Sequence, residues 1–168
     1  MDGVRALALM GFMGAGKSTV GRLVAERAGA PYRDMDEVIE ERCGMSIPEI
    51  FRARGEPAFR ALESDVLPSL LAPGAVVSLG GGAPVDDGNW AVISGGAVTV
   101  WLKVPLDRLL ARARAARGTR PLLDGRARAD VERLYEVRCR RYAQAEHVVD
   151  GTAAPDRIAE EVLRLWRR

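Results

Sequence analysis

A short glycine-rich segment near the start of the chain carries the clearest chemical signal. Residues 11–18 read Gly-Phe-Met-Gly-Ala-Gly-Lys-Ser and match G-x-x-x-x-G-K-[ST] at every position. Glycines let such a loop turn so that its backbone N–H groups face phosphate oxygens, while the lysine reaches the outer phosphates and the hydroxyl binds Mg²⁺. The segment therefore predicts a site for a nucleoside triphosphate with its metal ion.

Lys17 and Ser18 are the central residues of this predicted site. Lysine is scarce in the chain, because Lys103 is the only other one and every remaining basic residue apart from His147 is arginine. No G-x-G-x-x-G occurs in the turn, which excludes a dinucleotide-binding fold, and the Asn-Lys-x-Asp element of a GTPase is absent. The predicted nucleotide contacts in the segment are Gly14, Ala15, Gly16, Lys17, Ser18 and Thr19.

Two aspartates, Asp34 and Asp36, supply the predicted acid–base chemistry. They follow the second predicted strand, whose carboxyl end faces the same rim of a parallel sheet as the phosphate loop. One carboxylate can hold Mg²⁺ or its waters while the other accepts a bond from the attacking hydroxyl, although either one alone could simply cap the next helix. Ser78 stands near where the third strand would usually end in an acidic residue, which favours Asp34 on the metal side.

An arginine on an apolar helical stripe needs a partner. Arg138 shares its stripe with apolar and aromatic residues, namely Val131, Leu134, Tyr135 and Tyr142. The partner of its guanidinium is either a protein carboxylate or an anionic ligand held bidentately. Arg60 offers a second guanidinium, but Glu63 three residues later favours a local helix pair for it.

Three consecutive glycines, residues 80–82, follow the third predicted strand. Glycine at a strand end permits the backbone to approach a ligand closely, and a bare loop rarely needs three of them. This segment therefore predicts a second wall of the binding site.

Short apolar runs alternate with helical stretches, as in parallel strands joined by crossover helices. The predicted strands cover residues 6–10, 32–34, 76–79, 98–102 and 147–149. Helices are predicted over residues 17–28 and 155–166 and directly after Pro105. This order predicts an α/β fold of the P-loop NTPase class, similar to nucleoside monophosphate kinases, with a five-stranded parallel sheet flanked by helices.

Two segments interrupt this alternation. Residues 36–71 hold three helical stretches, which is too long for a simple crossover, so we predict a helical insertion that binds the substrate. Residues 117–128 are rich in Gly, Arg and Asp and suit a mobile lid, with an ordinary loop as the alternative.

The composition fits a single globular domain over residues 1–168. With 48% hydrophobic residues the chain is not disordered, and no apolar run is long enough to span a membrane. The net charge of +2 comes from 25 cationic and 23 anionic residues, so charge alone does not imply nucleic acid. Cys43 and Cys139 lack disulfide or zinc spacing. We expect a cytoplasmic monomer without nucleic-acid or membrane partners.

The ordered set of motifs resembles the shikimate kinase family over nearly the whole chain. The matching motifs are the phosphate loop from Gly11, Asp34-Met-Asp36, Phe59-Arg60-x-x-Glu63, Gly80-Gly81-Gly82, Arg120-Pro121-Leu122-Leu123 and Arg138-x-x-x-Tyr142. The phosphate loop is shared by a very large class, but the combination is specific. The resemblance implies that ATP phosphorylates the 3-hydroxyl of shikimate, giving shikimate 3-phosphate and ADP in aromatic amino-acid biosynthesis through chorismate.

The resemblance also implies roles for the acceptor residues. Arg60 and Arg138 would bind the carboxylate of shikimate, and Asp36 would bind its hydroxyls. Gly81 and Gly82 would complete the substrate contacts.

At the nucleotide end, the resemblance implies one Mg²⁺ per subunit with ATP as co-substrate. Ser18 would ligate the ion, and Asp34 and Ser78 would support it through water. Arg120 would reach the phosphates from the lid. The implied catalytic residues are Lys17, Asp34, Asp36 and Arg120, and which aspartate acts as the base stays open.

The chain departs from the family pattern at two places. Residues 151–155 read Gly-Thr-Ala-Ala-Pro where a basic residue is common in the family, which leaves the adenine contacts there open. The lid differs in length from that of some relatives, and we predict Arg112, close to the lid, as an adenine neighbour. Arg140 stands where proline is common, which makes Arg140 and Arg141 alternatives to Arg138 as the anchor. Gluconate kinase and nucleoside monophosphate kinase are the alternative activities. A nucleotide-binding module without turnover is disfavoured, since it would not need the phosphate-loop lysine, the carboxylate and the arginine together.

The predicted lid gives a first test. Replacing Arg120 with Ala removes a cation that would neutralise charge on the transferring phosphoryl group, and arginines in that role contribute roughly 10³-fold or more to the rate. We expect kcat to fall far more than the KM for shikimate rises, as measured by steady-state kinetics. A variant with normal kcat would identify residues 117–128 as a plain loop.

Overall fold

The computed structural model describes residues 4–115 and 127–167, and one parallel sheet of five strands forms its centre. The strands pair in the order β2-β3-β1-β4-β5, so the predicted five-stranded parallel sheet is confirmed. Each strand lies within one residue of its predicted bounds. The strands are β1 (Ala6–Met10), β2 (Tyr32–Asp34), β3 (Val76–Ser78), β4 (Ala97–Lys103) and β5 (His147–Asp150).

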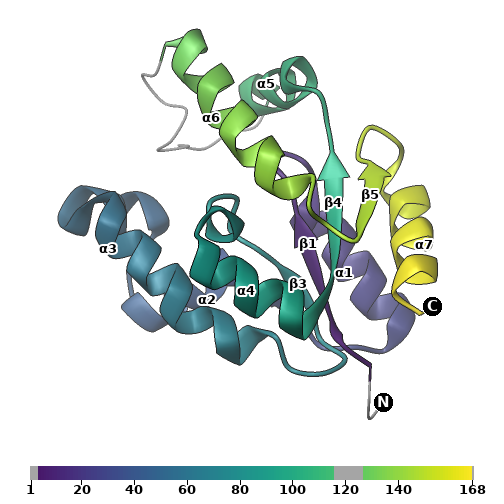
Figure 1. The fold of residues 1–168 in the computed structure, drawn as a ribbon. Helices are drawn as coiled ribbons and strands as arrows, with labels where there is room; N and C mark the ends of the chain where they lie inside the picture. The colour runs from purple at the N-terminus through teal and green to yellow at the C-terminus, as the bar shows by residue number, and fades with distance from the viewer. Residues whose placement is uncertain (1–3, 116–126, 168) are drawn as a thin grey trace.

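The central strand β1 is apolar and buried throughout. Leu7 pairs with Val76 of β3 on one side and with Val98 of β4 on the other. A parallel strand in this position needs cover on both faces of the sheet. Figure 1 shows α1 (Lys17–Ala28) and α7 (Pro155–Trp166) side by side on one face, with α4 (Asp87–Gly96) across the sheet from them. Because all strands run the same way, the phosphate loop after β1 opens at the same edge as the ends of β2 and β3.

Two helices, α2 (Met35–Cys43) and α3 (Ile47–Leu70), connect β2 to β3. Gly44 ends α2 in the left-handed conformation, and Ser46 with Glu49 forms a capping box at the start of α3. Inside α3 the backbone leaves helical geometry at Gly55, where φ is 77° and ψ is 170°. The kink divides α3 in two, so the three helical stretches expected in this region are present.

Two of the remaining helices precede and follow the predicted lid in the sequence. After β4 comes α5 (Leu106–Ala115), and α6 (Arg128–Tyr142) leads into β5. Residues 117–126 of the predicted lid, including Arg120, lie outside the described residues. No helix in the described ranges combines the length and apolarity that crossing a membrane requires.

One helical region was not expected from the sequence. A short 3₁₀ turn, η1 (Ala83–Val85), and α4 follow the three glycines. The Asp86 carboxylate accepts a hydrogen bond from the backbone N–H of Asn89 and so caps α4. Three glycines within α4 weaken its helical signal, which explains why the pattern did not reveal it.

Candidate active site

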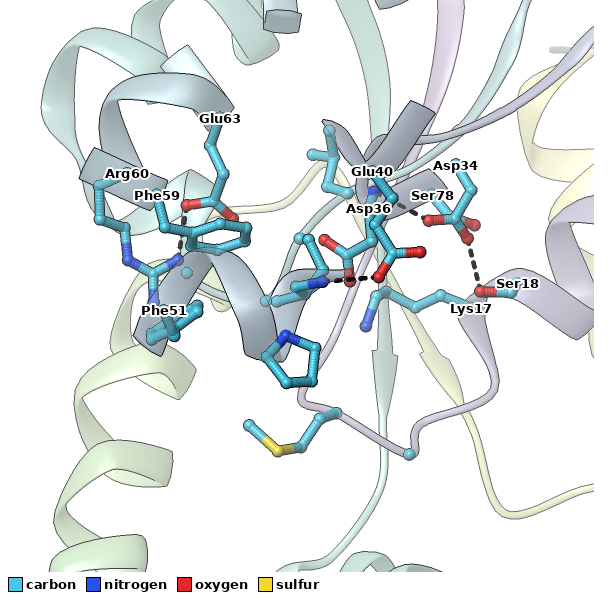
Figure 2. Close-up of a pocket in the computed structure, with 18 of the residues that line it drawn as sticks. Lys17, Ser18, Asp34, Asp36, Glu40, Phe51, Phe59, Arg60, Glu63 and Ser78 are labelled. Carbon is cyan, nitrogen blue, oxygen red and sulfur yellow. Dashed lines mark hydrogen bonds and ion pairs between the residues drawn. The ribbon is translucent and has the colours of Figure 1, made fainter. Parts of the chain in front are cut away.

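A pocket of about 400 Å³ opens at the carboxyl ends of β1, β2 and β3. Figure 2 shows two groups of polar side chains in it. Lys17, Ser18, Asp34, Asp36 and Ser78 form the phosphate end, and Arg60 with Glu63 lies at the arginine end. The pocket brings together nine of the predicted site residues, namely Gly14, Lys17, Ser18, Asp34, Asp36, Arg60, Gly81, Gly82 and Arg138, and it also includes Ser78.

The phosphate loop runs directly from β1 into α1. The N–H of Ala15 donates to the Phe12 carbonyl, and the Lys17 ammonium donates to the Gly11 carbonyl at 2.9 Å. Gly16 has a φ of 95° and precedes the first residue of α1, so the helix N-terminus faces the pocket mouth. Ala15, Gly16 and Thr19 lie in this loop and the first helical turn without lining the pocket.

Arg112 of α5 joins two segments on the nucleotide side. Its guanidinium donates to the carbonyl of Gly14 at 3.2 Å and to the carbonyl of Gly151 at 3.1 Å. It therefore connects the phosphate loop to the start of the 151–155 segment, where the family pattern places adenine contacts. A role in binding adenine itself stays a prediction.

Asp34 holds the phosphate end together through both of its carboxylate oxygens. Oδ2 accepts from the Ser18 hydroxyl at 2.7 Å and lies 3.0 Å from the Tyr32 hydroxyl. Oδ1 accepts from the N–H of Asp36 at 3.1 Å, which caps α2. The Tyr32 hydroxyl is also 2.9 Å from Ser78 Oγ, and burial raises the pKa of Tyr32 to about 12. Asp34 is thus both a helix cap and a neighbour of the predicted metal ligand.

The donors at this end suit Mg²⁺ held together with a nucleotide. No group of three or more His, Cys, Asp or Glu side chains in residues 4–115 and 127–167 forms a metal cage. Mg²⁺ prefers oxygen ligands and usually keeps waters and phosphate oxygens in its shell, so it needs few protein ligands. The Ser18 hydroxyl and the Asp34 carboxylate, 2.7 Å apart, meet that requirement.

Asp36 lines the pocket with an exposed side chain, and the protein groups beside it reduce its solvation. This loss of solvation raises its pKa, and the nearby Asp34 carboxylate raises it further, while the Lys17 ammonium acts in the opposite sense. A carboxylate with a raised pKa is a better proton acceptor than an ordinary surface aspartate. Asp36 therefore has the environment of a general base, although it becomes protonated sooner as the pH falls.

Arg60 lies between two carboxylates of its own helix. Its Nη1 is 2.5 Å from Glu63 Oε2, and its Nη2 is 2.9 Å from Glu56 Oε1. The local pair expected from the sequence is present, but Arg60 still lines the pocket and its side chain stays 29% exposed. Glu63 is almost fully buried, and burial raises its pKa although the neighbouring Arg60 lowers it. Its Oε1 has no hydrogen-bond partner among the described residues.

The glycines at positions 80–82 make room for three charged side chains. A Cβ at Gly80 would lie 2.3 Å from Glu63 Oε1, and one at Gly81 would lie 2.9 Å from Arg138 Nη1. A Cβ at Gly82 would lie 2.3 Å from Arg60 Nη1. The sequence analysis expected these glycines to admit a ligand, and the structure adds a different reason for them. Each one admits the charged end of a different pocket side chain.

Arg138 is the decisive residue at the arginine end. It is only 3% exposed, and burial lowers the pKa of its guanidinium. Its cation lies 5.3 Å from the centre of the Phe12 ring, and it forms no ion pair or hydrogen bond with the described residues. A buried cation without a carboxylate is costly unless a ligand supplies the anion. Of the two alternatives for Arg138, the structure therefore favours an anionic ligand.

The neighbouring arginines do not replace Arg138. Arg141 forms an ion pair with Asp87 and lies 5.5 Å from the Trp90 ring, away from the pocket. Arg140 is exposed and does not line the pocket. The alternative anchors named from the sequence are therefore not at this site.

Known proteins are similar to this chain in sequence and in fold. The sequence pattern of the family described as shikimate kinase matches residues 13–167. A shikimate kinase of Gloeobacter violaceus is 46% identical over 161 residues, which make up 95% of this chain and 90% of that protein. This chain belongs to the shikimate kinase family. A solved shikimate kinase from Acinetobacter baumannii, in complex with shikimate, shares 31% identity over 98% of this chain and 93% of that chain, with a TM-score of 0.87.

Membership of the shikimate kinase family confirms the resemblance stated from the motifs, and with it the predicted reaction, the ATP-dependent phosphorylation of shikimate. A gluconokinase from Sinorhizobium meliloti shows only the common fold, with 18% identity and a TM-score of 0.54 over 98% of this chain and 93% of that chain. The degree of similarity favours shikimate kinase over the gluconate kinase alternative.

Several pocket residues were not singled out from the sequence. Glu40 lines the pocket one helical turn after Asp36, so its spacing could have indicated it. Tyr32 lies two residues before Asp34 on the same face of β2 and supports the site through its hydroxyl without lining the pocket. Phe51 had no such signal, and its ring centre lies 4.8 Å from that of Phe59, which the sequence showed only as part of the Phe59-Arg60-x-x-Glu63 motif. They meet only because α3 kinks at Gly55.

The glycine segment gives the second test. In a Gly82→Ala variant, the new Cβ displaces the Arg60 guanidinium, which is the end of a flexible side chain, so the fold should tolerate the change. We expect the KM for the acceptor to rise about fivefold or more, equivalent to ~1 kcal/mol, with Tm nearly unchanged. Gly95→Ala is the matched control, because no atom lies within 4 Å of its added Cβ. Equal acceptor KM values for the two variants would show that Arg60 does not bind the acceptor.

Proposed function

We propose that this pocket binds shikimate with its carboxylate at the arginine end and its hydroxyls at the phosphate end. The observation that carries the proposal is the buried guanidinium of Arg138, which lines the pocket without a carboxylate partner among the described residues. Arg60 would supply a second cation to the same carboxylate through its exposed edge. A bidentate arginine suits a carboxylate in both charge and shape.

The proposed phosphoryl transfer uses the phosphate end. Asp36 accepts a hydrogen bond from the attacking hydroxyl and draws off its proton as the phosphorus–oxygen bond forms. The raised pKa of Asp36 supports this role. Lys17 places a positive charge beside the migrating phosphoryl group, and the N-terminus of α1 adds a partial positive charge there. ADP then leaves with the electrons of the broken bond.

The Mg²⁺ ion is part of the proposal. Ser18 would be its protein ligand, with Asp34 and Ser78 holding its waters, and the bound ion would neutralise charge on the phosphate oxygens. The hydrogen bond between Ser18 and Asp34 and the contact of Tyr32 with Ser78 support this donor set. Asp34 serves as the metal-side residue in this scheme and Asp36 as the base, since the N–H of Asp36 already occupies one Asp34 oxygen.

Three broader proposals accompany this scheme. Residues 36–71 would form the substrate-binding part of a single domain, and residues 117–128 would form the lid that carries Arg120. Ile47, Pro48 and Phe51 of α3 line the pocket, which supports the first of these. We also propose that the enzyme acts as a cytoplasmic monomer.

The choice of acceptor is tested by measuring ADP release with shikimate, gluconate or AMP. We expect shikimate alone to stimulate release, because the pocket offers two arginines, Arg60 and Arg138, for one carboxylate. Beyond Lys17, which faces the nucleotide phosphates, its lining residues include no further cation for the phosphate of AMP. Lys17→Met serves as the inactive control, since it removes the charge beside the phosphoryl group. Comparable turnover with gluconate would refute the assignment of the acceptor.

The role of Arg138 is tested by replacing it with Lys. Lysine keeps the positive charge but loses the planar fork that a carboxylate binds. We expect the KM for shikimate to rise about tenfold or more, equivalent to ~1.4 kcal/mol, with the KM for ATP nearly unchanged. A large fall in Tm with an unchanged KM for shikimate would instead assign Arg138 to packing.

A further inference from the structure

The Arg138 cation lies over the ring of Phe12. Phe12 belongs to the phosphate loop, yet it is 2% exposed and faces α6. The Arg138 guanidinium carbon lies 5.3 Å from the centre of its ring, and the Tyr135 ring meets it edge-on at 5.4 Å. A cation over an aromatic face is attracted by the negative charge of the ring, and the attraction strengthens where water is excluded.

A carboxylate oxygen lies close by and competes for the same cation. Glu63 Oε1 is buried without a hydrogen-bond partner among the described residues. It lies against Gly80, while Arg138 Nη1 lies against Gly81, so the two groups occupy adjacent positions on one backbone segment. The Glu63 charge acts on Arg138, but the two side chains form no ion pair. Arg60 holds the other oxygen of Glu63.

An ion pair between Arg138 and Glu63 would obstruct the acceptor. The carboxylate of the acceptor would have to displace an internal carboxylate before it could bind, and the site would lose affinity accordingly. An aromatic ring attracts the guanidinium without offering a hydrogen-bond acceptor of comparable strength. It can therefore hold the cation in place and leave its N–H groups available.

We propose that Phe12 is a positioning residue for acceptor binding, whose ring holds the Arg138 guanidinium away from Glu63 and open to the carboxylate of the acceptor. This inference rests on the proposed role of Arg138. It assigns to the phosphate loop a function at the opposite end of the pocket from the phosphates.

The test changes the charge of the ring while nearly preserving its shape. Phenylalanine with one, two or three ring fluorines is incorporated at position 12, because each fluorine weakens the negative charge of the ring face. We expect the KM for shikimate to rise stepwise along the series, reaching about three- to tenfold in the trifluorinated protein. The KM for ATP should stay within twofold, since the backbone of the loop is unchanged.

Three comparisons separate this role from general packing. Phe12→Leu should show an acceptor KM at least as high as that of the trifluorinated protein. Val162→Ala, in the buried face of α7, is the control for lost stability and should lower Tm without changing either KM. Inhibition by the carboxamide of shikimate, which lacks the negative charge, should be unaffected by fluorination.

Each outcome of the fluorination series either supports or overturns the role of Phe12. A stepwise rise confined to the KM for shikimate supports the proposal. A flat fluorination series, or equal rises in both KM values, overturns it. If Arg138→Lys raises the KM for shikimate while the fluorinated proteins behave like the wild type, only the role of Phe12 fails. If Arg138→Lys also leaves that KM unchanged, the proposed acceptor site itself fails.

Discussion

The candidate active site is organised around two buried side chains of opposite charge that do not pair. Arg138 of α6 and Glu63 of α3 reach the same strand end, where burial disfavours the charged form of each. Isolated buried charges are costly, so the surrounding structure has to hold both in place. Arg60 neutralises Glu63 from one side, and the Phe12 ring attracts Arg138 from the other. This arrangement leaves one positive charge that a bound anion can satisfy.

The parallel sheet makes this arrangement possible. Its strand order puts β1 beside β3, so the phosphate loop and the glycine segment begin at neighbouring strand ends. The absence of side chains at positions 80–82 then lets α3 and α6 bring charged groups close to the backbone from two directions. The site is thus assembled from segments far apart in the chain. Their relative positions depend on the register in which β1 pairs with β3.

Much of this structure was predictable because its signals are local. The phosphate loop, the five strands and the aspartate pair each follow from contiguous residues whose spacing fixes their geometry. The partner of Arg138 was not predictable, since the stripe on α6 shows only that the arginine faces inward. Whether a carboxylate meets it depends on how α3 crosses the sheet. The same limit applies to Phe51 and Phe59, which the kink at Gly55 brings together, and to α4, whose glycines conceal its helical pattern.

Asp34 links the predicted metal ligand to the predicted base, because its two oxygens serve different partners. One oxygen faces the Ser18 hydroxyl and the other fixes the backbone of Asp36. A ligand that engages the Ser18 hydroxyl competes with the Asp34 carboxylate for it, and the same carboxylate caps α2 beside Asp36. If that competition shifts the start of α2, the nucleotide and acceptor affinities are thermodynamically linked, and each ligand changes the binding of the other by the same factor. A helix cap that would elsewhere only stabilise the fold would then couple the two substrates.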